Sequence, residues 1–425
     1  MQSVDPVRRH ARVLVASMVG TAIEYYDFFI YGTAAALFFG KLFFPSQEPG
    51  MATLLSFMTL AVAFIARPFG AVLFGHFGDR VGRKSTLVAS ILLMGGSTLL
   101  IALLPTHAAI GWGAPALLCL LRIGQGLGLG GEWAGASLLA VENAPAGWDG
   151  RFGSAPQLGV PIGFVMANGL FLLLGLTLSE EQLLDWGWRV PFLFSAVLVA
   201  IGLWIRLKLT ETQEFARAMA DDPPEAVPLR VLLRDHRRAV LAASAGAVAC
   251  YAVFYIATSF ALAELTARMG YPRETVLGVQ MVAAVLLVIG NLLAGRHADR
   301  AGPANSLMLG VAGVFIAGLV FGPALGAGSL VLAGATLCAT LFVMGFTNAP
   351  LAGWMRRLFP VKVRYSGVAL SHNVGGVIGG GLMPLAAQAL STGGGGGYVG
   401  LILCIAALIS LAGVRLSLSI APSRV

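Results

Sequence analysis

Long apolar runs follow one another along the whole chain, and short polar segments separate them. An α-helix rises about 1.5 Å per residue, so a run of ~20 apolar residues crosses the ~30 Å hydrocarbon core of a bilayer. The pattern therefore predicts an all-α membrane protein. We place twelve spans, near residues 12–40, 51–77, 85–104, 114–141, 151–177, 187–209, 238–263, 274–295, 305–325, 329–353, 365–391 and 397–419.

The longest polar interruption lies in the middle of the chain, at residues 210–237. It holds several acidic residues and two adjacent prolines among basic residues, which is typical of a loop. Six predicted spans precede it and six follow it. The sequence thus predicts an N-terminal six-helix bundle over 1–209, a cytoplasmic linker over 210–237 and a C-terminal six-helix bundle over 238–425.

Composition supports the membrane assignment and narrows the function classes. Only 11% of the residues are charged, against roughly 25% in ordinary soluble domains. The four cysteines all lie within apolar runs, so they read as small core residues and not as a disulfide framework. We find no Cys/His metal spacing and no nucleophile motif. We therefore expect no enzyme, no metal and no cofactor.

The positive charges predict the orientation. If the N-terminus is cytoplasmic, most of the 28 basic residues fall in cytoplasmic segments, as the positive-inside rule requires. Both termini are then expected on the cytoplasmic side. The formal net charge of +8 reflects this topology, so the expected partner is the lipid bilayer and not nucleic acid. We expect the protein to act as a monomer.

One loop sequence occurs twice, half a chain apart. It runs from Gly75 to Lys84 between the second and third spans, and from Gly295 to Ala304 between the eighth and ninth. Two parallel halves explain the repeat. An Asp at a helix terminus and the Arg that follows it can pin neighbouring helices together in one conformation, so these loops are candidates for gating a conformational change. The candidate residues are Gly75, Asp79, Arg80 and Arg83 in the first copy and Asp299 and Arg300 in the second, which lacks the closing basic pair.

The first loop resembles the G-x-x-x-D-R-x-G-R-K signature of the major facilitator superfamily. Within that superfamily the chain is similar to the metabolite:proton symporters, whose members take up α-ketoglutarate, citrate, shikimate or proline/betaine. This resemblance implies the major facilitator fold, with two pseudo-symmetric bundles of six helices, and proton coupling. It does not specify the substrate. The matching stretches are Glu24 to Gly32, Arg67 to Gly70, Arg122 to Trp133, Trp186 to Phe192 and Phe359 to Gly367.

Five ionisable residues lie within predicted spans, and all are in the first half: Glu24, Asp27, Arg67, Arg122 and Glu132. Such residues are costly in a bilayer and are functional candidates by default. At ~1.5 Å per residue, Asp27 and Arg122 reach the same depth of a ~30 Å core. We therefore expect Asp27 or Glu24 to pair with Arg122. Such a pair can alternate between a salt bridge and a protonated acid, which is the chemistry of proton coupling, or it can be a static bridge between helices.

The other two charges within spans are expected nearer the cytoplasm. Glu132 lies ~15 Å below Arg122, and Arg67 reaches a similar level. With Asp79 and Arg83 they would form a cluster that keeps the cytoplasmic side closed. The alternative is that Glu132 and Arg67 only neutralise each other.

The substrate site is expected near the midplane, between the halves. Tyr251 and Tyr255 share a helix face at a spacing of four residues. They can offer aromatic surface and hydrogen bonds, or they can simply pack. The full set of candidates is Tyr26, Gln125, Gln157, Tyr251, Tyr255, His372 and Asn373.

Together these observations favour a proton-coupled symporter in the bacterial inner membrane. It would import a small organic acid or zwitterionic metabolite by alternating access, with the proton as coupling ion. The alternatives are a drug/proton antiporter, a facilitated uniporter and a non-transporting sensor. Residues 159–164 only partly resemble the Gly-Pro-x-x-Gly-Gly pattern of antiporters.

Overall fold

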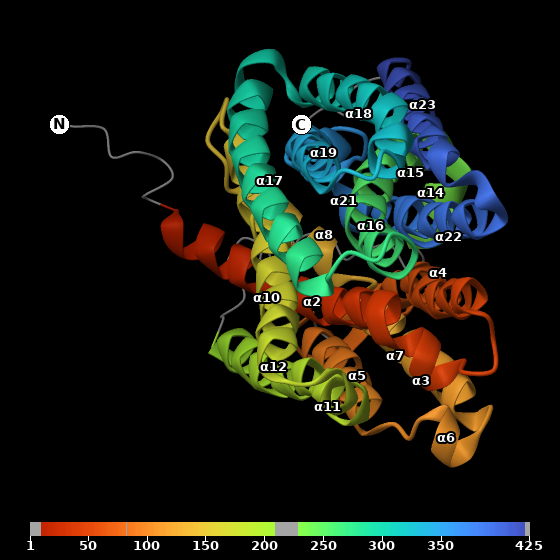
Figure 1. Cartoon of the computed structure of the whole chain (residues 1–425). Coiled ribbons are helices and arrows are strands. Elements are labelled where there is room, and N and C mark those ends of the chain that lie inside the picture. Colours follow the sequence, from red (N-terminus) through yellow and green to blue (C-terminus); the bar gives the residue numbers. More distant parts are fainter. Residues whose placement is uncertain (1–9, 82, 209–227, 421–425) are drawn as a thin grey trace.

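The computed structural model describes residues 10–81, 83–208 and 228–420 (Figure 1). Within its helices, the side chains of residues 12–13, 75–87, 205–208, 228 and 362 lie outside this description. Helices are the only regular elements in the described ranges. Their order follows the predicted spans closely, and most ends agree within a few residues.

The first half contains six membrane-spanning segments. Two of them are broken: the fourth at Gly130–Gly131, between α7 and α8, and the fifth at Leu158, between α9 and α10. The segments are α2 (Ala11–Ala34) continued by η1 (Ala35–Phe39) and α3 (Gly40–Phe43), α4 (Pro49–Val81), α5 (Arg83–Leu103), α7 (Gly113–Leu129) with α8 (Glu132–Glu142), α9 (Asp149–Gln157) with α10 (Gly159–Thr177), and α12 (Val190–Lys208). Short helices α6 (His107–Ile110), α11 (Glu180–Asp185) and η2 (Gly187–Arg189) lie in the connections.

The second half repeats this arrangement after α14 (Pro228–Asp235). Its first and fifth segments are interrupted by π-helical turns, which shift the register of side chains along the helix. The segments are α15 (Arg237–Tyr255) with η3 (Ile256–Phe260), α16 (Ala261–Ala263) and η4 (Glu264–Arg268); α17 (Arg273–Ala301); α18 (Pro303–Gly326); α19 (Leu330–Asn348) with α20 (Leu351–Arg356); α21 (Val361–Gly376) with η5 (Val377–Leu382), α22 (Met383–Leu390) and η6 (Ser391–Gly395); and, after η7 (Gly396–Tyr398), α23 (Val399–Leu418).

In the described part of the chain, nine helical segments are long and apolar enough to cross a membrane, and the longest, Val363–Leu418, joins the last two spans. The remaining two spans are α2, which carries the polar residues of the first span, and α5, of which Val88–Leu103 is an apolar helix. Large exposed hydrophobic side chains such as Phe69, Leu103, Leu176 and Ile316 occur on both halves, as expected of surfaces that face lipid.

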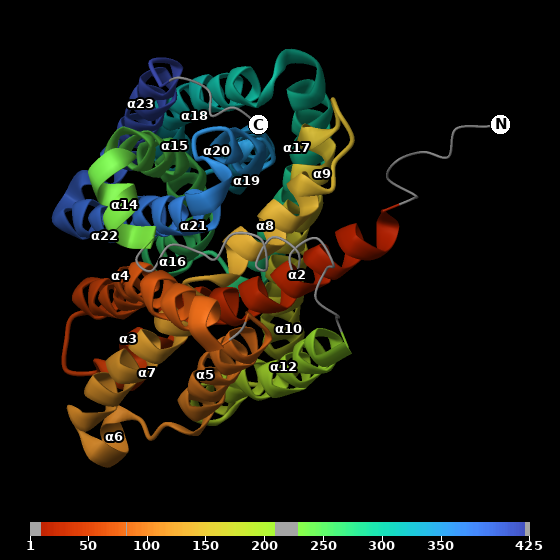
Figure 2. The same cartoon turned by 180° about the vertical axis from the view of Figure 1, so that it is seen from behind.

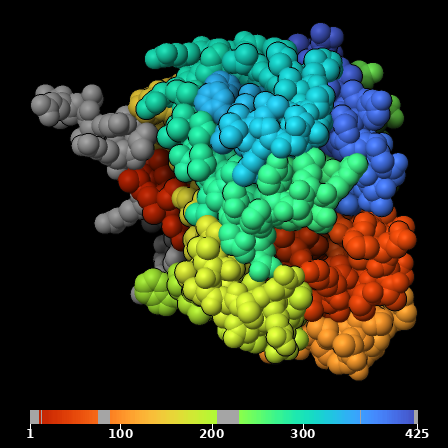
Figure 3. Space-filling view, viewed as in Figure 1, coloured from red at the N-terminus to blue at the C-terminus, as the bar shows by residue number. Residues whose placement is uncertain are grey.

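The helices of the two halves lie on opposite sides of a junction (Figures 1 and 2). In the space-filling view the teal-to-blue helices of the second half form the upper part and the red-to-yellow helices of the first half form the lower part (Figure 3). Helices α17 and α10 run side by side across the junction, and α4 packs against α21 and η5 there.

Glycines allow the closest helix contacts. A Cβ built on Gly126 of α7 would lie 2.2 Å from the Ala63 carbonyl oxygen, and one on Gly70 of α4 would lie 2.1 Å from the Leu127 carbonyl oxygen. Both contacts join α4 to α7. The Gly-rich stretch of the fourth span thus serves helix packing, as small residues commonly do in membranes.

Since the spans alternate in direction, the connections of the chain fall on two sides of the molecule. We call the side that carries the connections α8–α9, α17–α18 and α20–α21 the linker side, because α12 ends and α14 begins there. The other side is called the opposite side.

Candidate transport site at the junction of the halves

Asp27 lies inside the first-half bundle. Its carboxylate accepts hydrogen bonds from Ser195 of α12 and from Thr98 of α5, the latter at 3.2 Å. The side chain is 1% exposed. Thr98 in turn accepts a hydrogen bond from the Gln125 amide at 2.7 Å. A carboxylate at membrane depth is thus satisfied by neutral donors from two other helices.

Arg122 lies at the far end of this network. Its Nη1 donates to Gln125 Oε1 at 2.7 Å, its Nε to the Thr59 carbonyl at 3.4 Å and its Nη2 to the Leu60 carbonyl at 3.3 Å. The guanidinium also lies 3.7 Å from the centre of the Tyr31 ring, a cation–π geometry. All three of its nitrogens therefore have partners.

The prediction that Arg122 pairs with Asp27 or Glu24 is wrong in this structure. Two side chains, Gln125 and Thr98, lie between Arg122 and Asp27, and Arg122 contacts no carboxylate among the described residues. Depth along a helix does not fix which way each side chain points around the helix axis. The α4 carbonyls hold the guanidinium on that side.

Glu24 pairs with Arg67 instead, with 3.8 Å between Oε1 and Nη2. The two side chains are 3% and 2% exposed. Arg67 had been expected to join Glu132 near the cytoplasm, but it has no ion pair with Glu132 in the described chain. Ser90 donates to Glu132 at 2.7 Å.

Aromatic rings surround the Arg67 guanidinium at the junction. Its Cζ lies 5.1 Å from the centre of the Phe28 ring and 5.4 Å from that of Phe64. Tyr251 and Tyr255 of α15 face Phe64 from the other half, with ring centres 5.9 and 5.1 Å away. The shared face predicted for these two tyrosines is therefore directed at the first half, beside Arg67.

His372 of α21 extends this cluster toward the linker side. Its Nε2 lies 2.6 Å from the Tyr251 hydroxyl, and its ring stacks on Trp133 of α8 with ring centres 3.4 Å apart. The pair joins the two halves, since Trp133 belongs to the first and His372 to the second.

Several buried polar atoms of this region have no hydrogen-bond partner in the described chain. They are Arg67 Nε and Nη1, the Tyr255 hydroxyl, His372 Nδ1 and Trp133 Nε1. An unpartnered buried group typically costs about 1–3 kcal/mol. Such groups gathered at one place point to a site whose partner is a ligand or water.

The break in the fourth span also serves the junction. The carbonyl oxygen of Gly130 accepts a hydrogen bond from the Asn373 amide, and that of Gly131 accepts one from the Tyr365 hydroxyl at 2.8 Å. Both donors come from α21. Asn373, a predicted substrate residue, is therefore a contact between the halves here.

The second copy of the repeated loop holds the halves together. Asp299, at the end of α17, accepts hydrogen bonds from the backbone N–H groups of Gly150 and Arg151 and from the Arg151 side chain. These groups form the N-terminus of α9 in the first half, a favourable place for a negative charge. The missing basic pair at the end of this copy does not prevent the contact.

Three further contacts close the linker side. Arg356 and Arg357 of the second half lie 3.6 and 3.1 Å from the Asp149 carboxylate, and Arg364 lies 3.5 Å from that of Glu142. Together with Asp299 they bridge the halves in four places.

The remaining gating candidates lie elsewhere or outside the description. The side chains of Gly75, Asp79, Arg80 and Arg83 are outside the described residues, although their backbone is helical. Arg300 is exposed and forms no hydrogen bond or ion pair within the described part of the chain.

The halves also approach each other on the opposite side. A Cβ on Gly50 of α4 would lie 2.9 Å from Thr392, and one on Gly175 of α10 would lie 2.8 Å from Glu274 of α17. Arg67, Tyr255 and their neighbours are thus enclosed from both sides.

Two predicted substrate residues point away from the cluster. The Tyr26 hydroxyl donates to the Pro191 carbonyl at 2.8 Å, which directs this side chain toward α12 inside the first bundle. Gln125 belongs to the Arg122–Asp27 network. Gln157 is buried at the end of α9.

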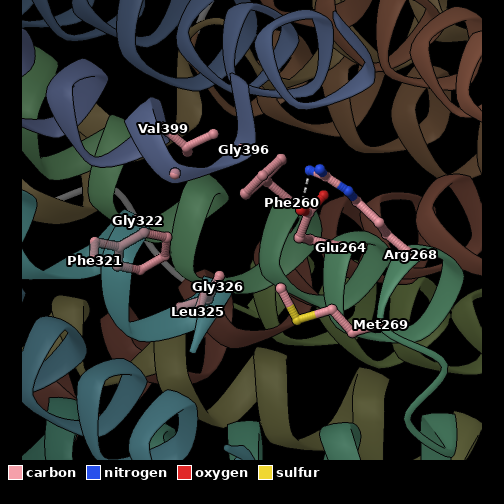
Figure 4. A pocket seen from close by; sticks show the side chains of 11 residues that line it. Phe260, Glu264, Arg268, Met269, Phe321, Gly322, Leu325, Gly326, Gly396 and Val399 are labelled. Atoms are coloured by element: carbon pink, nitrogen blue, oxygen red, sulfur yellow. Dashed lines mark hydrogen bonds and ion pairs between the residues drawn. The ribbon is translucent and has the colours of Figure 1, made fainter. Parts of the chain in front are cut away.

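The second half contains a buried carboxylate, Glu264, which lies just beyond the predicted end of the seventh span at residue 263. Its first span continues to Arg268, and Glu264 is 5% exposed. Glu264 accepts hydrogen bonds from Arg268 at 2.9 Å and from Ser391. It lines a cavity of about 210 Å³ with Phe260, Phe321 and the glycines near residue 396 (Figure 4). This cavity lies within the second half, apart from the junction.

The sequence pointed to some of the junction residues only indirectly. Phe64 lies three residues before Arg67, and Trp133 follows Glu132, so both share the neighbourhood of a singled-out charge. Thr98 and Ser195 gave no signal, because a lone hydroxyl in an apolar helix usually bonds its own backbone.

A helical membrane protein with two packed halves, a buried charged cluster at their junction and ion pairs closing one side has the features of a secondary transporter. The chain belongs to the Major Facilitator Superfamily, whose model matches residues 17–384. The predicted fold is confirmed, and so is the prediction of a transporter instead of an enzyme.

The chain is similar to named transporters over nearly its full length. It is 46% identical over 421 residues to the inner membrane metabolite transport protein YhjE of Escherichia coli K12, covering 98% of this chain and 96% of that protein. It is 37% identical over 390 residues to the shikimate transporter of the same organism, covering 90% and 88%. A structure of the xylose transporter XylE from E. coli, described as partially occluded and inward open, superposes with a TM-score of 0.73 at 16% identity over 94% of this chain and 98% of that one. The resemblance to metabolite transporters is thereby confirmed.

Proposed function

We propose that the protein is a proton-coupled symporter that carries a small organic acid or zwitterion inward across the bacterial inner membrane. The observation that carries the proposal is the buried group of Glu24, Arg67 and unpartnered polar atoms at the junction of the halves. Ionisable groups at membrane depth, enclosed between two movable halves, are the chemistry that proton-linked transport requires.

The relatives support the substrate class. One is named a metabolite transport protein and another a shikimate transporter, and shikimate is a hydroxylated ring acid. A guanidinium with open donors suits a carboxylate, since its planar fork can bind both oxygens.

In this proposal the linker side is the cytoplasmic side, as the distribution of basic residues favours. The ion pairs of Asp149, Asp299 and Glu142 would then hold the cytoplasmic side closed. Substrate release inward requires these pairs to break while contacts on the opposite side remain, which is alternating access. The domain division at residues 210–237 and a monomeric transporter belong to the same proposal.

The proton would be carried by a carboxylate of the first span, Glu24 or Asp27. Both are buried in this closed arrangement, so in this proposal water would reach them only when one side opens. Arg122 would support Asp27 through Gln125 and Thr98 and not by a direct bridge.

Accumulation in proteoliposomes tests this function. Vesicles containing the protein are given labelled shikimate, benzoate, citrate or glycine betaine, with and without an imposed pH gradient, acid outside. We expect at least one of these compounds to accumulate above its external concentration, and a protonophore to abolish the accumulation. If every transported compound only equilibrates across the membrane, with or without the gradient, proton-coupled symport is refuted.

A further inference from the structure

We propose that Arg67 binds the carboxylate of the substrate and that this carboxylate displaces Glu24, which then takes up the coupling proton. This inference rests on the proposed function and assigns its chemistry to particular atoms. The substrate class it names is a compact monocarboxylate with a ring or other flat body.

The comparison of two buried arginines carries the first step. Arg122 uses Nε, Nη1 and Nη2 in hydrogen bonds to Thr59, Gln125 and Leu60. Arg67 is equally buried, yet its Nε and Nη1 have no partner in the described chain, and its Nη2 is 3.8 Å from Glu24. One guanidinium is therefore satisfied by the protein, and the other keeps two donors open and only a long ion pair on the third. Once Glu24 is displaced, Nη2 together with Nε or Nη1 offers the two parallel N–H bonds that a carboxylate accepts.

The surroundings of Arg67 define the rest of the ligand. Phe28 and Phe64 flank the guanidinium, and Tyr255 of the other half contacts both rings, with ring centres 6.1 and 5.1 Å away. The Tyr255 hydroxyl and His372 Nδ1 have no partner in the part of the chain described. A flat body can lie against these rings, while its hydroxyl groups reach the two open polar atoms.

The second step is an exchange of negative charges. Arg67 neutralises one carboxylate, and a second carboxylate beside it in a low-dielectric site disfavours having both ionised. When the substrate anion arrives, the Glu24 carboxylate therefore accepts a proton from water on the side of entry. When the substrate leaves on the other side, Glu24 releases the proton and pairs with Arg67 again. One anion and one proton move together, and no covalent bond forms or breaks.

Several titratable groups of the described residues surround Glu24 and Arg67. Tyr25 of α2 and Tyr251 and Tyr255 of α15 interact electrostatically with Arg67, as does His372 of α21. Helix α10, which packs against α2, has no titratable residue in its sequence. Among the other helices packed against α2, α9 carries Asp149 and Arg151 in its first turns, α8 carries Glu132 and Glu142, and α12 carries Arg206 and Lys208 in its last turns.

Asp27 has a different environment, although it lies one turn from Glu24. Its partners are Ser195 and Thr98, which come from α12 and α5 within the first half. It has no ion pair with Arg67 in the described structure. The exchange therefore assigns the displaced carboxylate to Glu24.

Binding measured against pH tests the exchange. The purified protein in lipid nanodiscs is titrated with shikimate and with benzoate, and with the methyl ester of each, between about pH 5.5 and 8.5. We expect at least one acid to bind, with an affinity that falls about tenfold per pH unit once Glu24 is ionised, because binding then requires one proton. The matching ester, which has no negative charge, should bind at least about tenfold more weakly at low pH.

Two isosteric variants locate the proton. Glu24→Gln should bind the acid tightly over the whole range, with the pH slope removed, because Gln cannot compete as an anion. Asp27→Asn should keep the slope. Arg67→Lys should weaken binding of the acid at least about tenfold, since an ammonium cannot reproduce the fork of two adjacent donors.

The exchange is overturned if neither acid binds, or if an ester binds as tightly as its acid. It is also overturned if the pH dependence of the affinity survives Glu24→Gln, or if it is lost in Asp27→Asn alone. The proposed function fails differently, by uptake that ignores the pH gradient. Gradient-driven accumulation that persists in Glu24→Gln would contradict the exchange and leave proton-coupled symport intact.

Discussion

Within the membrane-spanning helices, hydroxyl groups connect buried charged and polar side chains of different helices. Thr98 shows this most clearly, because it donates to Asp27 and accepts from Gln125, so that it connects α2, α5 and α7. Without it, a buried carboxylate and a buried amide would each lose a partner. Arg122, at the end of the same network, would lose its only connection to Asp27.

Removing this hydroxyl should destabilise the first half. Thr98→Val keeps the shape of the side chain but removes the hydrogen bonds to Asp27, from Gln125 and to the Met94 carbonyl of its own helix. We expect a loss of about 1–3 kcal/mol, the cost of leaving the buried carboxylate and amide unpaired. Thermal unfolding in detergent measures it. Ser97→Ala is the matched control, because the Ser97 hydroxyl bonds only the Leu93 carbonyl of its own helix. Equal melting temperatures of the two variants would contradict the role of Thr98.

The sequence identified the buried charges of the first half but not their partners. An ionisable residue within an apolar run is visible from composition alone, and its depth follows from the helix rise. The pairing depends on rotation about each helix axis, which depth does not contain. Arg122 therefore donates hydrogen bonds to α4 carbonyls and to Gln125 and does not pair with a carboxylate. Arg67 pairs with Glu24 and not with Glu132.

The membrane-spanning helices of this fold could be predicted from the sequence because the thickness of the bilayer fixes their length. Apolar runs gave the number and order of spans, and their ends agreed within a few residues in most cases. The π-helical turns were not predictable, since they depend on packing and not on composition. One such case is the seventh span, which continues through η4 to Arg268. Glu264 therefore lies within this span and is buried inside the second half.

Close packing of α4 on α7 gives a prediction at this scale. Gly126→Ala should prevent the native contact, because the new Cβ would lie 2.2 Å from the Ala63 carbonyl oxygen and 2.8 Å from the Ala66 Cβ. Gly96→Ala of α5 has no atom within 4 Å of the new Cβ and replaces Gly by a better helix former, so it should be neutral or slightly stabilising. The yield of monodisperse protein and the melting temperature compare the two. A Gly126→Ala protein that behaves like Gly96→Ala would show that α4 and α7 are further apart than described.

The whole molecule is held closed on its linker side by contacts between halves that are far apart in sequence. The repeated loop predicted that Asp299 would take part, and the structure adds its partner, the N-terminus of α9. Asp149, Glu142, Arg356 and Arg357 belong to no comparable motif, and Arg364 lies in the matching stretch Phe359 to Gly367, which indicated no partner. The closed state itself could not be read from the sequence, because a transporter has two packings of similar free energy.

The Asp299 contact should bias this equilibrium. Asp299→Ala removes three hydrogen bonds to α9 and should move the population toward molecules open on the linker side. Spin labels at Asn143 of the first half and Asn305 of the second, both exposed, report the separation by pulsed electron resonance. Arg300→Ala, a neighbouring exposed residue, is the control and should leave the distance distribution unchanged. A distribution unaltered by Asp299→Ala would mean that the contact does not favour the closed state.

The most direct measurement of the central claim is the movement of protons that accompanies an acid across the membrane. Proteoliposomes with a pH-sensitive dye inside are given external shikimate or benzoate without an imposed gradient, and vesicles without protein correct for passive entry. We predict that the lumen acidifies as the transported acid enters, and that Glu24→Gln reduces the protons carried per molecule. Protein-dependent entry of the acid with no change in luminal pH would contradict the account.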